Sequence, residues 1–121
     1  MGTLLFLDGN ALTGTIPKAF VTMTHLASLN LLANQLSGTI PAGLPQTQLL
    51  SLGCNKFTGA VPQMDFQTLH SQHGCDINDD AEWCATYFGQ NWSNTFSCPL
   101  PPGAAQYCNA KCSVLPPSSS S

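Results

Sequence analysis

The chain has 121 residues, of which 7% are charged, and three lysines against six acids give it a net charge of −3 without any arginine. Nucleic acid is therefore excluded as a partner, because phosphate binding requires clustered positive charge. A chain of this length is expected to form one domain around one core.

The amino-terminal half contains three copies of one pattern, L-x-L-x-x-N-x-[LF]-[ST]-G-x-[IV]-P. The copies are LFLDGNALTGTIP (residues 5–17), LNLLANQLSGTIP (29–41) and LSLGCNKFTGAVP (50–62), and their asparagines are 24 and then 21 residues apart. One such unit has too little core to fold alone, so the units are expected to stack on one another. The repeat therefore predicts an α/β solenoid.

Each position of the pattern has a physical role. The two leucines of L-x-L are expected to point into the core from a short strand, while the side chains between them face solvent. The asparagine turns the chain, and its side-chain amide can bond the backbone of its own loop and of neighbouring units. The glycine then allows a bend, and the proline falls where no backbone donor is needed. The sequence thus predicts a ladder of stacked amides, formed by Asn10, Asn34 and Asn55.

These repeats resemble the plant-type class of leucine-rich repeats, found in polygalacturonase inhibitors and in the ectodomains of plant receptor kinases. The resemblance covers residues 2 to about 74. It implies a right-handed coil with short parallel strands on its concave side, a second short strand near each L-[ST]-G segment, and recognition of protein or carbohydrate. The third repeat is three residues short between Pro41 and Leu50, so a mostly irregular convex side is expected there.

The outward positions of the expected concave strands form a candidate binding surface. Several of them are large and apolar, although they should face water in an isolated solenoid. We predict that this surface contacts a partner, with Phe6 and Leu32 as anchors. The aligned outward positions are Leu4, Phe6, Asp8, Ser28, Asn30, Leu32, Leu49, Ser51 and Gly53.

A degenerate fourth repeat is expected to complete a repeat region over residues 1–74. Phe66, Leu69 and Ser71 fall in its strand register, and Gly74 stands where the asparagine should be. An atypical terminal repeat is expected because the last unit must cover core on one side and meet water on the other.

The six cysteines predict disulfides made in an oxidising compartment, because they form an even set concentrated in one part of the chain. Cys54 precedes the third asparagine, and Cys75 falls one residue beyond the equivalent point of the fourth repeat. Adjacent strands would bring these two sulfurs near bonding distance, so we predict a Cys54–Cys75 bridge. Four cysteines then remain to close a cap, although 15 connectivities are formally possible: Cys84, Cys98, Cys108 and Cys112.

Residues 75–113 are expected to form this cysteine-rich cap. The segment 96–112 resembles the F-x-C-P-[IL]-P…C…C endings of the caps of surface leucine-rich-repeat proteins. Residues 79–88 have acids in the first turn and an apolar stripe, which predicts a short helix lying over the last unit. The stripe consists of Trp83, Tyr87 and Phe88.

The sequence contains two incomplete candidates for a metal site. The run from Asp76 begins like a calcium loop, but Ala81 replaces the required glycine and Tyr87 the bidentate glutamate. His70 and His73 would lack thiolate partners for zinc if the nearby cysteines are oxidised. We therefore expect no metal, no cofactor and no enzyme activity.

Asn91-Trp92-Ser93 is a glycosylation sequon in the expected cap. Residues 114–121 are rich in proline and serine and are expected to form a linker or tail. No apolar stretch is long enough to span a membrane. The secretory signal implied by the cysteines is not among these residues, so we expect the sequence to be the carboxyl-terminal part of a longer chain.

Two functions fit these features. The first is an extracellular or cell-surface module that recognises a protein or glycan through its concave face. The second is a structural protomer that packs on copies of itself through its uncapped amino-terminal unit, forming a glycosylated filament at the cell surface or wall.

Overall fold

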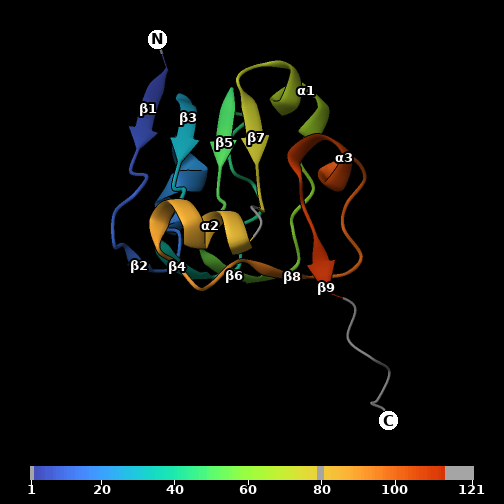
Figure 1. Cartoon of the computed structure of the whole chain (residues 1–121). Helices are drawn as coiled ribbons and strands as arrows, with labels where there is room; N and C mark the ends of the chain where they lie inside the picture. Colours follow the sequence, from blue (N-terminus) through green and yellow to red (C-terminus); the bar gives the residue numbers. More distant parts are fainter. Residues whose placement is uncertain (1, 79–80, 114–121) are drawn as a thin grey trace.

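The computed structural model describes residues 2–78 and 81–113, which form two parallel sheets (Figure 1). The first has the order β1-β3-β5-β7, and the second has the order β2-β4-β6-β8-β9. The first sheet comprises Thr3–Phe6, Leu26–Asn30, Leu49–Ser51 and Gly74–Asp76. The second comprises Thr13–Gly14, Gln35–Gly38, Lys56–Gly59, Thr95–Ser97 and Cys112–Ser113. Each of the three repeats supplies one strand to each sheet, so the prediction of a strand-rich, repeating fold is confirmed.

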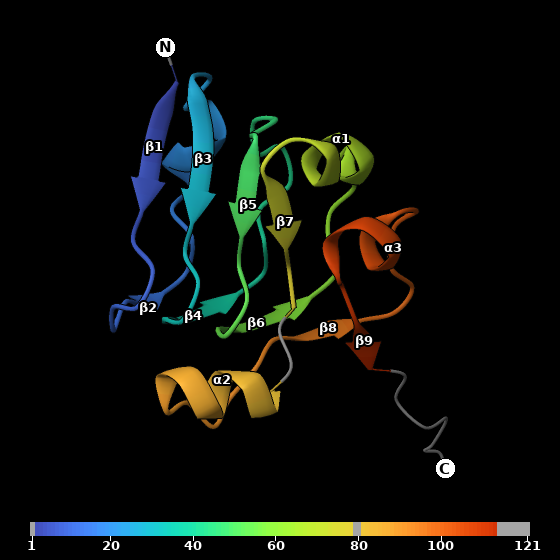
Figure 2. The ribbon, with the colours of Figure 1, turned by 45° about the horizontal axis from the view of Figure 1, so that its top comes forward.

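Helices occupy little of the described part of the chain. They are η1 (Lys18–Thr22), α1 (Phe66–Ser71), α2 (Ala81–Phe88) and α3 (Ala104–Cys108). The return segment of the second repeat, residues 42–48, forms neither helix nor strand. The helices α1 and α3 pack beside β7, at the end of the first sheet opposite β1 (Figure 2).

The residue before the asparagine adopts a left-handed backbone conformation in all three repeats. The φ angles are 70° at Gly9, 62° at Ala33 and 55° at Cys54. The left-handed conformation costs a residue with a β-carbon about 1–2 kcal/mol, so other contacts must stabilise the turn in the second and third repeats. The asparagine that follows provides them.

The second and third asparagines form the predicted ladder. The Asn34 side chain accepts a hydrogen bond from the Leu12 backbone N–H (3.1 Å) and donates to the Leu7 carbonyl (3.0 Å), both in the preceding repeat. Asn55 repeats this arrangement with Leu36 N–H (3.1 Å) and Leu31 carbonyl (2.8 Å). Both side chains are fully buried. Each amide therefore joins its own repeat to the one before it.

The fourth asparagine of the ladder is Asn94. Its oxygen accepts from the Phe57 N–H (2.9 Å), and its nitrogen donates to the carbonyls of Leu52 (2.9 Å) and Ile77 (2.8 Å). Ile77 thus takes the place that Leu52 has in the third repeat. The fourth repeat runs from β7 through Ile77, departs from the ladder in a segment that contains α2, and returns at Asn94 and β8.

The predicted course of the fourth repeat was wrong. Phe66, Leu69 and Ser71 lie in α1 rather than in a strand, and Gly74 begins β7 instead of occupying the asparagine position. The helix forms there because Asp65 caps its amino end, accepting from the Thr68 hydroxyl (2.7 Å) and backbone N–H (3.1 Å). These two bonds hold the pKa of Asp65 below its ordinary value.

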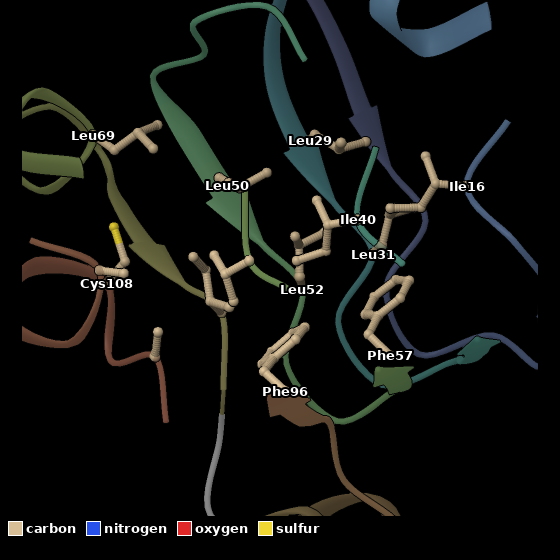
Figure 3. Close-up of a cluster of buried hydrophobic side chains, with 14 of the residues drawn as sticks. Ile16, Leu29, Leu31, Ile40, Leu50, Leu52, Phe57, Leu69, Phe96 and Cys108 are labelled. Carbon is tan, nitrogen blue, oxygen red and sulfur yellow. The ribbon is translucent and has the colours of Figure 1, made fainter. Parts of the chain in front are cut away.

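One hydrophobic core runs through the repeats and the cysteine-rich segment. Leu29 and Leu50 enter it from the first sheet, Leu52 enters it from the residue after β5, and Phe57 and Phe96 enter it from the second sheet (Figure 3). Side chains beyond residue 74 belong to the same cluster: Ile77, Phe96, Ala104, Cys108 and Ala110. The expected boundary between the repeat region and the cap, which lies between residues 74 and 75, falls inside β7. The tail predicted for residues 114–121 lies outside the described residues.

Replacing Asn55 with alanine is expected to destabilise the fold strongly. The change leaves the buried Leu36 N–H unsatisfied, at about 1–3 kcal/mol, and removes one hydrogen bond, worth about 0.5–1.5 kcal/mol, from the Leu31 carbonyl, which still accepts from Asn34. We expect urea unfolding to show a loss of about 2–4 kcal/mol. Asn10→Ala is the matched control, because the Asn10 side chain is exposed and bonds only within its own repeat. Equal losses for the two variants would contradict the ladder as a source of stability.

Candidate binding surface

The outer face of the first sheet, directed away from the core, carries the residues predicted to bind a partner. The strand register places Leu4 beside Ser28 and Ser28 beside Leu49, as expected from the repeat alignment. Leu4 and Phe6 are 57% and 55% exposed, and Asp8 is also exposed. This group lies on and just after β1, at the edge of the sheet.

The remaining predicted positions are less accessible. Ser28 and Ser51 are buried, as is Gly53, while Asn30 and Leu49 are half-buried. The Asn30 side chain accepts a hydrogen bond from the Leu32 N–H at 3.1 Å. The accessible apolar part of this face is therefore Leu4, Phe6 and part of Leu49, and we call these three residues together with Asp8 the outer-face group.

Leu32 does not have the open position expected of an anchor. It is half-buried and packs against a small buried cluster formed by Ala33, Cys54 and Cys84. Cys84 belongs to α2, which lies outside the turns of the second and third repeats (Figure 2). Leu32 is therefore only partly accessible, because α2 covers one side of it, and its role as an anchor stays a prediction.

The six cysteines form three disulfides: Cys54–Cys84, Cys75–Cys108 and Cys98–Cys112. The prediction of disulfides is confirmed, but the predicted Cys54–Cys75 pair is wrong. Strand pairing sets Cys75 beside Leu50, four residues before Cys54, so the two cysteines are not aligned. Cys75 instead reaches α3, and Cys54 in its left-handed turn meets α2.

The described part of the segment between Ile77 and Asn94, which we call the insertion, is attached to the repeats through Cys84 and Trp92. The Cys54–Cys84 disulfide holds α2, and the Trp92 indole donates a hydrogen bond to the Asn34 carbonyl at 3.0 Å. The Lys56 ammonium lies 4.7 Å from the centroid of the Trp92 ring, a favourable cation–π distance. The insertion thus contacts both inner asparagine turns.

The aromatic side chains of α2 are exposed rather than packed on the repeats. Trp83, Tyr87 and Phe88 are 38%, 67% and 39% exposed, and the Trp83 ring lies 5.2 Å from that of Tyr87 and 5.5 Å from that of Phe88. The expected contact through this stripe is therefore wrong. The helix packs on the repeats through Cys84, which is fully buried. The position of this cysteine is the sequence signal that would have identified the face of α2 that contacts the repeats.

The candidate metal ligands are dispersed. His70 and His73 are exposed, and His70 Nδ1 lies 3.1 Å from the Tyr107 carbonyl. No three His, Cys, Asp or Glu side chains gather into a possible metal site within residues 2–78 and 81–113. The acids at positions 79 and 80, considered as calcium ligands or helix caps, lie outside the described residues.

Two curated proteins are similar to part of the chain. The leucine-rich repeat receptor protein kinase MSP1 of rice (Oryza sativa subsp. japonica) is 47% identical over 52 residues, which is 41% of this chain and 4% of that protein. The rice leucine-rich repeat receptor protein kinase MSL1 is 43% identical over 61 residues, or 49% of this chain and 4% of that protein. No protein-family model and no solved structure matches the chain. The similarity supports a leucine-rich-repeat protein of the plant type.

The helices in the described part of the chain are all too short or too polar to cross a membrane.

Removing the Cys54–Cys84 bridge is expected to lower stability. The bridge joins residues 30 apart in the sequence. By restricting the unfolded chain, a cross-link that closes a loop of this size stabilises the folded state by about 3–4 kcal/mol. The variant with both cysteines changed to serine should lose about that amount in urea unfolding under non-reducing conditions. Peptide mapping of the unreduced protein should recover Cys54 linked to Cys84. Recovery of Cys54 linked to Cys75 would contradict the structure.

Proposed function

We propose that this chain is part of an extracellular leucine-rich-repeat solenoid that recognises a protein or glycan through the outer face of its first sheet. Support for the solenoid comes from three repeats with the same pair of strands and the same left-handed turn, and from the matching bonds by which Asn34 and Asn55 each reach the preceding repeat. The similarity to two rice proteins named for leucine-rich repeats supports the same fold.

Three disulfides support an extracellular location. Disulfides persist in oxidising compartments and are rare in the cytosol, where thiols are kept reduced. All six cysteines are bonded. A surface with few charges also suits a secreted protein whose solubility comes from hydroxyl, amide and glycyl groups.

The observation that carries the recognition proposal is the exposure of Leu4 and Phe6. Large apolar side chains gathered on an exposed face are typical of surfaces that bind a partner. An aromatic residue beside an accessible carboxylate, here Phe6 near Asp8, offers both apolar contact area and a hydrogen-bond acceptor. With a net charge of −3 and few charged residues, the expected ligand is a largely uncharged protein surface or a neutral glycan. We propose that the chain acts by this binding and not by catalysis.

The substitution Phe6→Asp tests this proposal. It should abolish the binding of ligands recovered by screening the immobilised chain against neutral oligosaccharides and plant extracellular domains, because it places a charge in the apolar contact. Circular dichroism should remain unchanged, since Phe6 is 55% exposed.

Gln67→Asp is the matched control, because it adds the same charge at an exposed position of α1. Binding that survives Phe6→Asp as fully as Gln67→Asp would reject the outer face as the binding surface.

Asn91 is proposed to carry an N-linked glycan. Its side chain is exposed in a segment without regular structure, and the ring of Trp92, which separates it from Ser93, is held against the repeats by the Asn34 carbonyl. The bulky side chain at the middle position of the sequon is therefore engaged with the repeats.

Protein secreted from a eukaryotic host should lose the mass of one glycan on treatment with an N-glycan-releasing enzyme. Asn91→Gln and Ser93→Ala should each remove the same mass from the untreated protein. A mass equal to that of the bare chain before treatment would contradict glycosylation at this position.

A further inference from the structure

Three aromatic side chains of α2 form a cluster at the surface, which we call the aromatic platform. They are Trp83, Tyr87 and Phe88, and their exposed fractions are 38%, 67% and 39%. The centroid of the Trp83 ring lies 5.2 Å from that of Tyr87 and 5.5 Å from that of Phe88. Aromatic rings at these distances attract one another, so each ring stabilises the position of the others. The platform therefore presents ordered apolar surface to solvent.

The chain turns back beside α2 immediately after Phe88. Gly89 has a left-handed backbone with a φ of 66°, and its N–H bonds to the Ala85 carbonyl at 3.0 Å. The Gln90 N–H bonds to the Cys84 carbonyl at 3.3 Å, so residue 90 lies against the helix. Figure 2 shows the segment then running beside α2 toward β8. The glycosylation sequon, which begins at the next residue, is therefore beside the helix that carries the platform.

Asn91 is held in place from both sides. Gln90 is buried, and the Trp92 ring is hydrogen-bonded to the repeats and lies 4.7 Å from the Lys56 ammonium. The Asn91 side chain between them is exposed. It lies three residues after Phe88, so the two α-carbons are at most about 11 Å apart. A sugar attached to Asn91 therefore starts within reach of the platform.

We propose that the aromatic platform binds the first sugars of an N-linked glycan on Asn91. The proposal rests on the glycosylation proposed above. These first sugars are N-acetylglucosamines, which present C–H groups on the faces of the ring and an N-acetyl methyl group at its edge. Such groups pack on aromatic rings while the hydroxyls stay in water. Because the glycan is tethered beside the platform, it meets the rings at a high effective concentration.

A protein partner fits the platform less well. An aromatic side chain buries about 150–250 Å² when it is fully covered, and these three are already partly buried, so the platform offers on the order of 300 Å². A stable protein interface buries about 800 Å² on each partner. A glycan needs no such area, because its attachment is covalent. The size of the platform therefore favours the tethered sugar.

The test compares hydrogen exchange of α2 in the secreted, glycosylated chain and in Asn91→Gln. The α2 amides should exchange about fivefold faster in Asn91→Gln, because bound sugar opposes local opening of the helix. In glycosylated protein trimmed to its first N-acetylglucosamine, NMR should detect contacts between the N-acetyl methyl protons and aromatic protons. Equal exchange in the two proteins, with no such contact, would overturn the proposal.

Tyr87→Ala separates binding at the platform from a general effect of the glycan. In the glycosylated chain it should remove most of the fivefold protection of α2. In the Asn91→Gln background it should change the exchange of α2 little, because the Tyr87 side chain is 67% exposed. Equal changes in the two backgrounds would overturn the proposal.

Thr22→Asn in the Asn91→Gln background is the matched control. It moves the sequon to an exposed position of η1, with Thr24 as the hydroxyl residue. A glycan there should leave α2 exchanging as in the unglycosylated protein. Protection of α2 equal to that given by the Asn91 glycan would overturn the proposal.

The intact mass separates this proposal from the one on which it rests. A bare chain would reject both the glycosylation of Asn91 and the binding of its glycan, whereas an occupied Asn91 with an unprotected α2 would reject the binding alone. Light scattering of the glycosylated chain should show a monomer. A dimer that Tyr87→Asp dissociates would assign the platform to a second copy and overturn the proposal.

Discussion

The buried asparagine amide is the interaction on which this structure depends. Where each repeat turns from the first sheet to the second, a backbone N–H and several carbonyls point into the interior, away from any strand. An unsatisfied buried group of this kind costs about 1–3 kcal/mol. One amide, with an acceptor and two donor hydrogens, satisfies the turn of its own repeat and the N–H of the repeat before it. A side chain of this shape and chemistry is required at one point in every inner repeat.

The fourth repeat shows that the ladder depends on the asparagine amide more than on a constant number of residues between the strand and the asparagine. Between Ile77 and Asn94 the backbone leaves the ladder and forms α2, yet Asn94 returns to satisfy Phe57 and Leu52 as the earlier asparagines do for their neighbours. An insertion is tolerated because its ends meet at the same place, and the entropic cost of closing a longer loop grows slowly with its length. The Cys54–Cys84 bridge and the Trp92 hydrogen bond then hold the inserted segment against the repeats.

Sequence reasoning succeeded where local periodicity determines structure. The offsets within L-x-L-x-x-N placed the strands of the first three repeats, their register and the bonds of Asn34 and Asn55. It failed where the chain departs from the period. Asn94 was missed because 16 residues separate it from Ile77, and Cys75 was paired with Cys54 on an alignment that placed the fourth strand too early. The partial burial of Leu32 depends on where α2 packs. This is a long-range contact, which the local repeat pattern does not predict.

The position of the insertion determines how much of the outer face is accessible. Because α2 packs at Cys54 and Ala33, it shields Leu32 at the carboxyl ends of the strands and leaves Leu4 and Phe6 open on β1. These two residues owe part of their exposure to the absence of a strand beside β1 in the described chain. Leu4 and Phe6 project from the same face of β1, since successive residues of a strand alternate between faces. Access to this face is therefore limited by α2 near Leu32 and is open at β1.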